Sequence, residues 1–436
     1  MPRKKVLIIT YYWPPSGGSG VQRWLKFSKY LRDFGWEPII FKPEKAEYPE
    51  LDHSLSRDVP NNIEVINSPI WEPYQLYKKF TGRDKNQKVQ AGFINEDKEP
   101  GKLEKIAIWL RGNIFIPDAR RFWIRPGTKK LNNWLQHNSV DAIVSTGPPH
   151  STHLIAMNAS QKNNIPWLAD FRDPWTQIDF YDKLMLTKRS DRKHKRLEKR
   201  VLQKASQVVT VSPAWAEDLE QIGGRKVNVI TNGFDTSDFV DLEDYDYQKF
   251  SITHLGSMNQ DRNPETLWKA LSSICEEQEG FRDNLQIKLI GKTDHSVFKS
   301  IEENGLTQNL VNFKYLPHSE AINEAKKSAV LLLALNNTPN VQGIIPGKLF
   351  EYLALERPIL CTGNIEGDSA KILTKTESGT AVGFEDFKAT KDQIEKWYKG
   401  FIDKKLQGSG LSKNQFSRRS LTEGISLLLN EMTEEK

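Results

Sequence analysis

Short apolar runs recur along the first half of the chain, and helical patterns separate several of them. The runs show no sustained alternation with polar residues, which is typical of strands buried on both faces of a parallel sheet. They are KVLIIT (5–10), EPIIF (37–41), IEVI (63–66), VDAIVST (140–146), IPWLAD (165–170), QVVTVS (207–212) and KVNVIT (226–231). One helix has apolar residues at helical spacing from Val21 to Phe34 and is expected to end at Gly35. The alternation predicts a doubly wound α/β domain.

A second series of the same kind follows an acidic connection at residues 235–248. Asn263 as a cap and Pro264 as a first-turn residue mark the start of one of its helices. At 436 residues the chain is too long for one hydrophobic core. We therefore predict two Rossmann-like domains, residues 1–234 and 235–410, that face each other across a cleft. The strands predicted for the second are SITHLG (251–256), LQIKLIG (285–291), VNFKYL (311–316), AVLLLAL (329–335) and PILCT (358–362).

The composition fits a protein of the reducing cytosol. The sequence has two cysteines, Cys275 and Cys361, which do not make a disulfide framework. No apolar run approaches the ~20 residues that cross a bilayer. The N-terminus enters a predicted strand without a signal-peptide pattern. We therefore expect a cytoplasmic protein.

Positive charge is concentrated in one segment. The net charge is +6, and ten Lys or Arg residues lie between Lys183 and Lys204 on a predicted helix. A solvated helix face is the simpler interpretation. The alternative is a peripheral contact with anionic lipid at the inner face of the membrane, or with an anionic acceptor. No nucleic-acid-binding module is recognisable, so nucleic acid is not expected as a partner. The polar residues 78–105 predict an excursion from the first domain.

A glycine loop follows the first strand of each predicted domain. TYYWPPSGGSG (10–20) contains Gly17 and Gly18 and directs backbone N–H groups to the edge of the sheet where α/β proteins bind ligands. It is not a dinucleotide fingerprint, because Arg23 occupies the third glycine position, and it is not a P-loop. A tight structural turn is an equally good interpretation. In the second domain, Gly256 and Arg262 bracket the equivalent loop.

Histidines and charged residues follow two later strands of the first domain. STGPPHSTHLIA (145–156) places His150 and His153 near the start of a helix, at the ligand edge of the sheet. No third ligand has metal spacing, so a zinc site is not expected. ADFRDPW (169–175) places Asp170, Arg172 and Asp173 at the end of the next strand. These charges either pair with one another or serve the chemistry of an acceptor.

The stretch GIIPGKLFEYLALERPIL (343–360) reads as a loop, a short helix and a buried strand. Lys348 and Glu351 lie three residues apart near the predicted helix start, so they point to the same side. A loop of N–H groups running into a helix attracts anions, and Lys348 beside it could hold a phosphate. Glu351 could accept hydrogen bonds from sugar hydroxyls. Taken alone, a solvated Lys–Glu pair is the commoner case.

In combination these motifs resemble a family 4 glycosyltransferase of the GT-B fold, over essentially the whole chain. The matching pieces, in order, are YYWPPSGGSGVQR, STGPPHSTHLIA, PWLADFRDPW, VSPAWAEDL with TNGFD, HLGSMNQDRNP and PGKLFEYLALERPIL. The resemblance implies a second domain that binds a nucleotide-sugar donor and a first domain that binds the acceptor. It also implies transfer with retention, no metal requirement, and a C-terminal helix, 411–436, that packs back on the first domain.

The same resemblance implies roles for the candidate residues. Glu351 would hold the donor ribose, and Lys348 and Arg262 would hold its diphosphate. Many members of the family carry another Glu eight positions before the ribose Glu, and this chain has Gly343 there. Its N–H and those of Ile344 and Ile345 are expected to substitute. The further donor-side candidates are Gly17, Gly18, Gly256 and Leu349, and the catalytic candidates on the acceptor side are His150, His153 and Asp173.

We therefore predict a retaining, hexosyltransferase-type glycosyltransferase. Its donor is a nucleotide-diphosphate sugar, and its acceptor is a cell-envelope or exopolysaccharide glycan, free or lipid-linked. No cofactor beyond this co-substrate is expected. Two alternatives remain open. One is a catalytically degenerate scaffold that binds nucleotide sugar, motivated by Gly343. The other is a GT-B nucleotide-sugar epimerase, which would consume donor without an acceptor.

Overall fold

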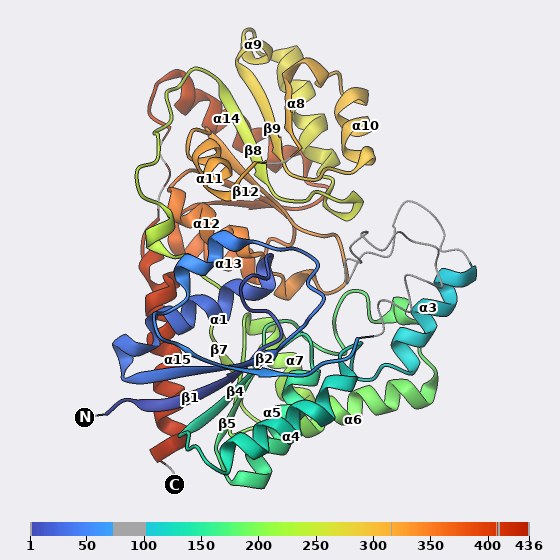
Figure 1. Cartoon of the computed structure of the whole chain (residues 1–436). Helices are drawn as coiled ribbons and strands as arrows, with labels where there is room; N and C mark the ends of the chain where they lie inside the picture. The colour runs from blue at the N-terminus through green and yellow to red at the C-terminus, as the bar shows by residue number, and fades with distance from the viewer. Residues whose placement is uncertain (1, 73–101, 315, 407, 409, 435–436) are drawn as a thin grey trace. The chain divides into compact units, whose positions relative to one another are not determined.

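The computed structural model describes residues 2–72, 102–314, 316–406, 408 and 410–434 (Figure 1). It divides into two compact units, one of Met1–Thr231 with Arg418–Lys436 and one of Asn232–Ser417. The sequence placed the boundary after residue 234. Most of the predicted excursion at 78–105 lies outside the described residues.

The first unit contains a parallel sheet of seven strands in the order β3-β2-β1-β4-β5-β6-β7. Each apolar run predicted for this domain overlaps one of them, although β7 is shorter than its run. The strands are β1 (Lys4–Ile9), β2 (Trp36–Pro43), β3 (Glu64–Ser68), β4 (Ala142–Gly147), β5 (Trp167–Phe171), β6 (Gln207–Thr210) and β7 (Asn228–Val229). Side chains of β1 alternate between two cores, because Leu7 and Ile9 enter one and Val6 and Ile8 enter the other.

Helices cover both faces of this sheet (Figure 1). Buried residues of α4, α5, α6 and α7 pack on one face, and those of α1 and α15 pack side by side on the other. α1 continues as a 3₁₀ turn that ends at Gly35, whose φ of 81° suits glycine. The α-helices are α1 (Ser19–Tyr30), α3 (Lys102–Asn113), α4 (Ile124–Leu135), α5 (Ser151–Asn163), α6 (Lys188–Lys204), α7 (Pro213–Gly223) and α15 (Arg418–Glu434).

The second unit has a six-stranded parallel sheet in the order β10-β9-β8-β11-β12-β13. The sequence prediction missed the edge strand β13, because GTAV is short and begins with glycine. The strands are β8 (Phe250–Leu255), β9 (Leu285–Ile290), β10 (Leu310–Phe313), β11 (Val330–Ala334), β12 (Ile359–Thr362) and β13 (Gly379–Val382). The α-helices are α8 (Glu265–Glu277), α9 (Phe281–Asn284), α10 (His295–Glu303), α11 (His318–Lys326), α12 (Gly347–Leu355), α13 (Asp368–Thr376) and α14 (Phe387–Ile402).

One local prediction in this unit was wrong. Pro264, not Asn263, is the N-cap residue of α8, and no side chain caps this end. The side chain of Asn263 instead accepts a hydrogen bond from the indole N–H of Trp268 and donates one to Ser300 Oγ. Asn263 therefore ties α8 to α10 rather than capping a helix.

Each sheet reverses its strand order once, between β1 and β4 in the first unit and between β8 and β11 in the second. In open α/β sheets, ligands bind at the carboxyl ends of the strands beside such a reversal, because the two flanking loops diverge there. The loops that leave β1, β4, β8 and β11, together with the helices that follow them, carry every donor-side and catalytic candidate found in the sequence except Asp173.

Candidate functional site

In the second unit, the loop after β11 leads into α12. Pro346 is the N-cap residue of α12, with an extended backbone, and the helix runs from Gly347 to Leu355. Leu349 and Phe350 are fully buried in the core. Burial of this face directs Lys348 and Glu351 to the other side of the helix. The side chain of Leu349 supports the site from inside the core, so only its backbone could contact a ligand.

Lys348 reaches from the first turn of α12 to the end of β8. Its ammonium lies 3.1 Å from His254 Nε2 and also donates to the carbonyl oxygen of Leu255. An ammonium has three N–H donors, so one is left for a ligand. The pKa of Lys348 is lowered to about 7, first by burial and then by the charge of Arg262, while the charge of Glu351 opposes the shift. The site therefore holds a cation at an energetic cost that a bound anion would relieve.

His254 was not identified from the sequence, although it lies directly before the glycine loop. Its Nδ1 is 3.0 Å from the carbonyl oxygen of Leu332 on β11. A carbonyl oxygen can only accept a hydrogen bond, so Nδ1 must be the donor. The imidazole therefore carries its proton on Nδ1, and Nε2 is left to accept from Lys348. Burial, and next the charge of Lys348, hold the pKa of His254 well below its usual range. His254 is thus a neutral residue that positions Lys348.

Arg262 and Glu351 complete this cluster. Arg262 donates from Nε to Asn336 Oδ1 at 2.6 Å and from a terminal nitrogen to the carbonyl oxygen of Ser257 at 3.2 Å. Glu351 is 31% exposed, and its Oε1 lies 3.1 Å from Nε2 of His318, a second residue that the sequence did not reveal. Two cations with a carboxylate one helical turn away can hold a diphosphate and a hydroxyl-bearing group together.

The glycine positions fit this cluster to different degrees. Gly256 has φ +88°, and a Cβ there would lie 3.3 Å from Lys348 Nζ, so glycine permits both the turn and the close approach of the lysine. At the other loop, the N–H of Gly343 donates to Asn340 and that of Ile344 donates to Val341. These two N–H groups are already used within the turn, and Ile345 is largely buried in the core.

In the first unit, hydrogen bonds join the loop after β1 to the segment that follows β2. The N–H of Gly17 donates to the carbonyl oxygen of Glu50 at 3.0 Å. Gly18 is exposed, precedes α1 as its N-cap residue and has φ +82°. Gly18 therefore has a conformational reason to be glycine, and it is the more accessible of the two.

Arg23, at the third glycine position of this loop, forms a buried ion pair. It donates to both carboxylate oxygens of Asp170 at 3.0–3.2 Å. The same carboxylate accepts from the indole N–H of Trp24 at 2.7 Å and from the hydroxyl of Thr146 at 2.9 Å. Asp170 is fully buried, so its carboxylate near the end of β5 joins α1 and β4 to that strand.

His150 and His153 lie at the start of α5, and both are more than nine-tenths buried. The ring of His150 stacks on that of Trp175, with 4.5 Å between the ring centroids, and the ring of His153 stacks on that of Phe171, with 4.7 Å between the centroids. Burial lowers the pKa of both, that of His153 to about 3, so both imidazoles are neutral at pH 7.

One ring nitrogen of each histidine, Nδ1 of His150 and Nε2 of His153, is buried without a hydrogen-bond partner in the described structure. Both lie close to Gly147, since a Cβ there would be 3.0 Å from the first and 2.5 Å from the second. The other nitrogen of His153 lies 2.8 Å from Ser145 Oγ. The two rings therefore leave hydrogen-bonding capacity at the carboxyl end of β4.

Asp173 lies beyond the end of β5, beside Arg172. Its side chain is 39% exposed, and its carboxylate is 3.5 Å from Arg172 Nε. Burial raises the pKa of Asp173 against the opposing charge of Arg172. Arg172 also donates to the carbonyl oxygens of Gly20 and Pro148, so it joins the start of α1 to the loop that follows β4. Asp173 can accept a proton more readily than an ordinary surface carboxylate.

The described residues include no group of three or more His, Cys, Asp or Glu side chains arranged to hold a metal ion. Among them there is also no helix both long and apolar enough to cross a membrane. Cys361 is buried in β12, and burial raises the pKa of its thiol to about 12. A thiolate at this position is therefore not available for chemistry.

Comparisons with known proteins fit these observations. Residues 93–238 match the model of Glycosyltransferase Family 4. Sucrose-phosphate synthase from Thermosynechococcus elongatus has a similar structure, with a TM-score of 0.64, 14% identity and full coverage of both chains. HepE from Anabaena, solved with UDP and glucose, matches with a TM-score of 0.60 and 14% identity over 98% of this chain and 100% of its own.

A protein assigned as UDP-N-acetylglucosamine 2-epimerase from Listeria monocytogenes is also similar. Its TM-score is 0.52 at 10% identity, and the match covers 100% of this chain and 98% of the other. No curated protein matches the sequence. At these identities the structural matches show the fold. Residues 93–238 thus match Glycosyltransferase Family 4, in agreement with the resemblance seen in the sequence, and the whole chain has the predicted GT-B fold of two Rossmann-like domains.

Proposed function

We propose that the protein is a retaining, hexosyltransferase-type glycosyltransferase that transfers a sugar from a nucleotide-diphosphate sugar to a cell-envelope or exopolysaccharide glycan. The observation that carries the proposal is the cluster of Lys348, Arg262 and Glu351 beside the reversal of strand order in the second unit. Its chemistry matches a nucleotide-sugar donor, which offers a diphosphate to cations and ribose hydroxyls to a carboxylate. The Anabaena HepE structure contains UDP and glucose, the two parts into which a nucleotide-sugar donor of this class would separate.

The residues of this cluster would act on the leaving group. Cleavage of the bond between the sugar and the diphosphate develops negative charge on the leaving nucleotide. Lys348 and Arg262 would stabilise that charge, with Lys348 held in position by neutral His254. No metal is part of the proposal, because two cationic side chains would supply the compensating charge.

The acceptor would bind at the first unit. We assign the removal of the proton from the attacking hydroxyl to Asp173, whose raised pKa favours proton acceptance. His150 and His153, as neutral imidazoles, would position hydroxyl groups rather than act as acids. His153 is fully buried, so it would act on the acceptor only indirectly, by holding the end of β4 in position.

The test begins with a donor screen by thermal shift with UDP, GDP, ADP and TDP sugars, because a bound donor raises the apparent stability. Transfer from the selected donor is then compared between the parent and Glu351→Ala. We expect the variant to lose most of its activity. Glu320→Ala, on the exposed surface of α11, is the matched control and should behave as the parent. Parental transfer by Glu351→Ala would remove the central assignment.

Gly343 supports a second candidate, a scaffold that binds nucleotide sugar without turnover. The position lacks the carboxylate seen in many family members, and the N–H groups of Gly343 and Ile344 are engaged within their own turn. Donor binding without transfer, over a broad panel of acceptors, would favour this candidate. The fold is also shared with an epimerase, so the reaction without acceptor should be followed too. Conversion of donor to an epimer or to free nucleotide would identify that activity.

We further propose that α6 makes a peripheral contact with anionic membrane. Its buried face carries His194, Glu198, Val201 and Leu202, and the basic residues of the helix lie on the exposed side. Burial, and then the charges of Arg121, Arg196 and Arg189, lower the pKa of Lys193, which reflects the density of positive charge. Such a surface attracts acidic headgroups.

Apolar side chains lie next to this basic surface. Met185, just before α6, is 49% exposed, and Ile106 and Trp109 on α3 are 54% and 40% exposed. The Asn113 side chain joins the two segments through hydrogen bonds with Met185 and Thr187. Exposed apolar residues beside a basic helix suit an interface that enters the headgroup region. Such docking would bring a lipid-linked acceptor to the enzyme.

Co-sedimentation with vesicles tests this contact. We expect binding to vesicles that contain phosphatidylglycerol at low salt, release at high salt, and no binding to phosphatidylcholine alone. Charge reversal at Lys193 and Arg196 should reduce binding, whereas reversal at Lys269, an exposed residue of α8, should not. Absence of binding at low salt would refute the contact and leave the transferase proposal intact.

A further inference from the structure

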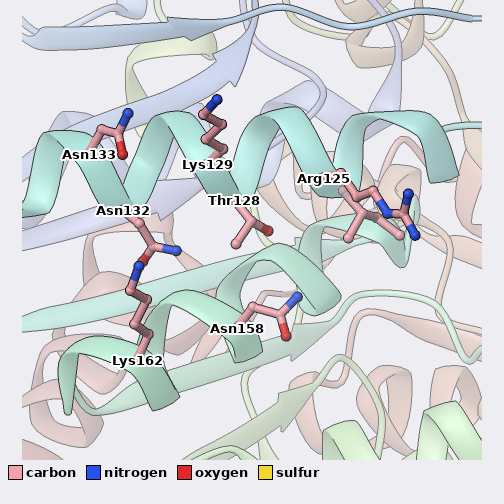
Figure 2. Close-up of a pocket in the computed structure, with 8 residues that line it drawn as sticks. Arg125, Thr128, Lys129, Asn132, Asn133, Asn158 and Lys162 are labelled. Atoms are coloured by element: carbon pink, nitrogen blue, oxygen red, sulfur yellow. The ribbon is translucent and has the colours of Figure 1, made fainter.

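A polar groove lies between α4 and α5 in the first unit, on a surface that the proposed chemistry does not use. Its volume is about 350 Å³, and it is lined by Ile124, Arg125, Thr128, Lys129, Asn132, Asn133, Asn158 and Lys162. Figure 2 shows Thr128 and Asn132 on the side of α4 toward α5, with Asn158 and Lys162 on α5 and with Lys129 and Asn133 along the opposite side of α4. The groove is therefore lined by side chains from both helices, and Lys129 and Asn133 form its outer rim.

The charge of this groove is entirely positive. Neither α4 nor α5 contains an Asp or Glu residue. Arg125, Lys129 and Lys162 have no ion-pair partner in the part of the chain that the structure describes. Arg125 and Lys129 are also four residues apart on α4, an arrangement of like charges that destabilises a helix. An anion bound in the groove would remove this repulsion.

The groove also offers hydrogen-bonding groups that the fold does not use. Asn132 is 7% exposed, and its Oδ1 accepts from Asn163 Nδ2 at 2.7 Å. The amide nitrogen of Asn132 has no partner among the described residues and lines the hollow. The hydroxyl of Thr128 is buried without a partner in the described structure. Buried polar groups are normally paired, so the Thr128 hydroxyl points to a polar ligand.

We propose that this groove binds the acidic units of the glycan acceptor. The three cations would hold a carboxylate or phosphate ester, and the carboxamides of Asn132, Asn133 and Asn158 would hold sugar hydroxyls. No aromatic side chain lines the groove, so stacking of nucleic-acid bases is not supported. Ile124 is the one aliphatic residue in the lining, which does not suit a lipid chain. The inference rests on the proposed function, because it names the chemical class of that acceptor.

The location of the groove fits an extended ligand. α5 begins directly after His150, at the carboxyl edge of the sheet. Asn158 and Lys162 lie about 10 and 16 Å further along this helix, at about 1.5 Å per residue. A glycan of several units could therefore lie along α5, with its acidic units in the groove and its growing end near His150. The groove would act as a subsite that selects charged chains.

Calorimetric titration of the full chain without donor tests the subsite. The probes are tetragalacturonate, a phosphorylated maltotetraose, neutral maltotetraose and inorganic phosphate. We expect one or both acidic tetrasaccharides to bind to the parent. The double variant Lys129→Glu, Lys162→Glu should bind them about tenfold more weakly, the range expected for two reversed surface charges. Lys130→Glu makes the same change on α4 at a residue outside the groove and should leave binding unchanged.

Three results would overturn the subsite. They are equal binding of neutral maltotetraose, inorganic phosphate that binds as tightly as the tetrasaccharides, and equal losses for Lys130→Glu and the double variant. Because these titrations use no donor, they remain valid if transfer is never observed. Glu351→Ala should bind the acidic glycan as the parent does, which separates failure of the subsite from failure of the donor site. Protection of Lys129 and Lys162 in the parent from acetylation by the bound glycan provides a readout that does not depend on the variants.

Discussion

The clearest test of the donor site is the pH dependence of nucleotide-sugar affinity. Lys348 has a pKa lowered to about 7, first by burial and then by Arg262. A diphosphate next to the ammonium would restore its charge, so the donor binds best to the protonated form. Affinity should therefore be highest below pH 7 and should fall as the pH rises. A lysine at its usual value of about 10.4 would give no change in this range.

The size of the effect follows from the protonated fraction of the free protein. With a pKa of about 7, this fraction is about 0.9 at pH 6 and about 0.03 at pH 8.5. The apparent dissociation constant scales inversely with the fraction that can bind, so it should rise about 30-fold between these values. Binding should also take up protons, about half a proton per site at pH 7 and close to one at pH 8.5.

Isothermal titration at constant ionic strength measures both quantities, the affinity directly and the proton uptake from buffers with different heats of ionisation. A nucleotide sugar is the right probe, because neither of its esterified phosphates loses a proton in this range. Lys348→Met should bind weakly at every pH and show no slope. Lys269→Met, at an exposed position of α8, should keep the parental slope. A flat profile in the parent, or the same slope in Lys348→Met, would refute the reasoning.

Three further changes test the framework around the two units. Asp170→Ala leaves the guanidinium of Arg23 buried without a carboxylate. Urea denaturation should show a free energy of unfolding lower by about 3–5 kcal/mol. A loss under about 1 kcal/mol would show that the pair is not structural. Gly256→Ala places a Cβ at φ +88° next to Lys348, and should cost about 1–2 kcal/mol and weaken donor binding in the same titration. Tyr352→Phe removes the hydroxyl that accepts a hydrogen bond from the N–H of Leu255. Thermal unfolding should show a free energy of unfolding lower by about 1–3 kcal/mol. An unchanged free energy would mean that water replaces the hydroxyl.

The sequence predicted the sheets well because a parallel strand is buried on both faces and leaves a continuous apolar run. β1 and β11 illustrate this, since the last four residues of β1 and every residue of β11 are buried. β13 is an edge strand with partly exposed residues, so its burial leaves a weaker pattern. The loops with Gly256 and Lys348 were found because glycine, proline and charge interrupt the apolar pattern there.

The residues that the sequence did not reveal depend on contacts between distant segments. His254 lies inside an apolar run and becomes part of the site because β8 pairs with β11 and lies under α12. His318 meets Glu351 only because α11 and α12 are neighbours in space. For the same reason, the sequence could not decide whether Asp170 pairs internally or faces an acceptor. Its partners come from two other segments, α1 and β4, and their positions follow from the order of the strands.

Two buried cations illustrate how the fold separates structure from function. Arg23 in the first unit has a fully buried carboxylate that accepts two or more of its N–H groups, and its charge is compensated within the fold. Lys348 in the second unit meets a neutral imidazole and a carbonyl oxygen, and Glu351 only partly offsets the charge of Arg262 nearby. The first arrangement is complete without a ligand. The second is relieved when an anion arrives, and this relief can contribute to donor binding and to stabilisation of the leaving nucleotide. A cation that the protein itself does not neutralise is therefore the strongest structural argument that the second unit binds a diphosphate.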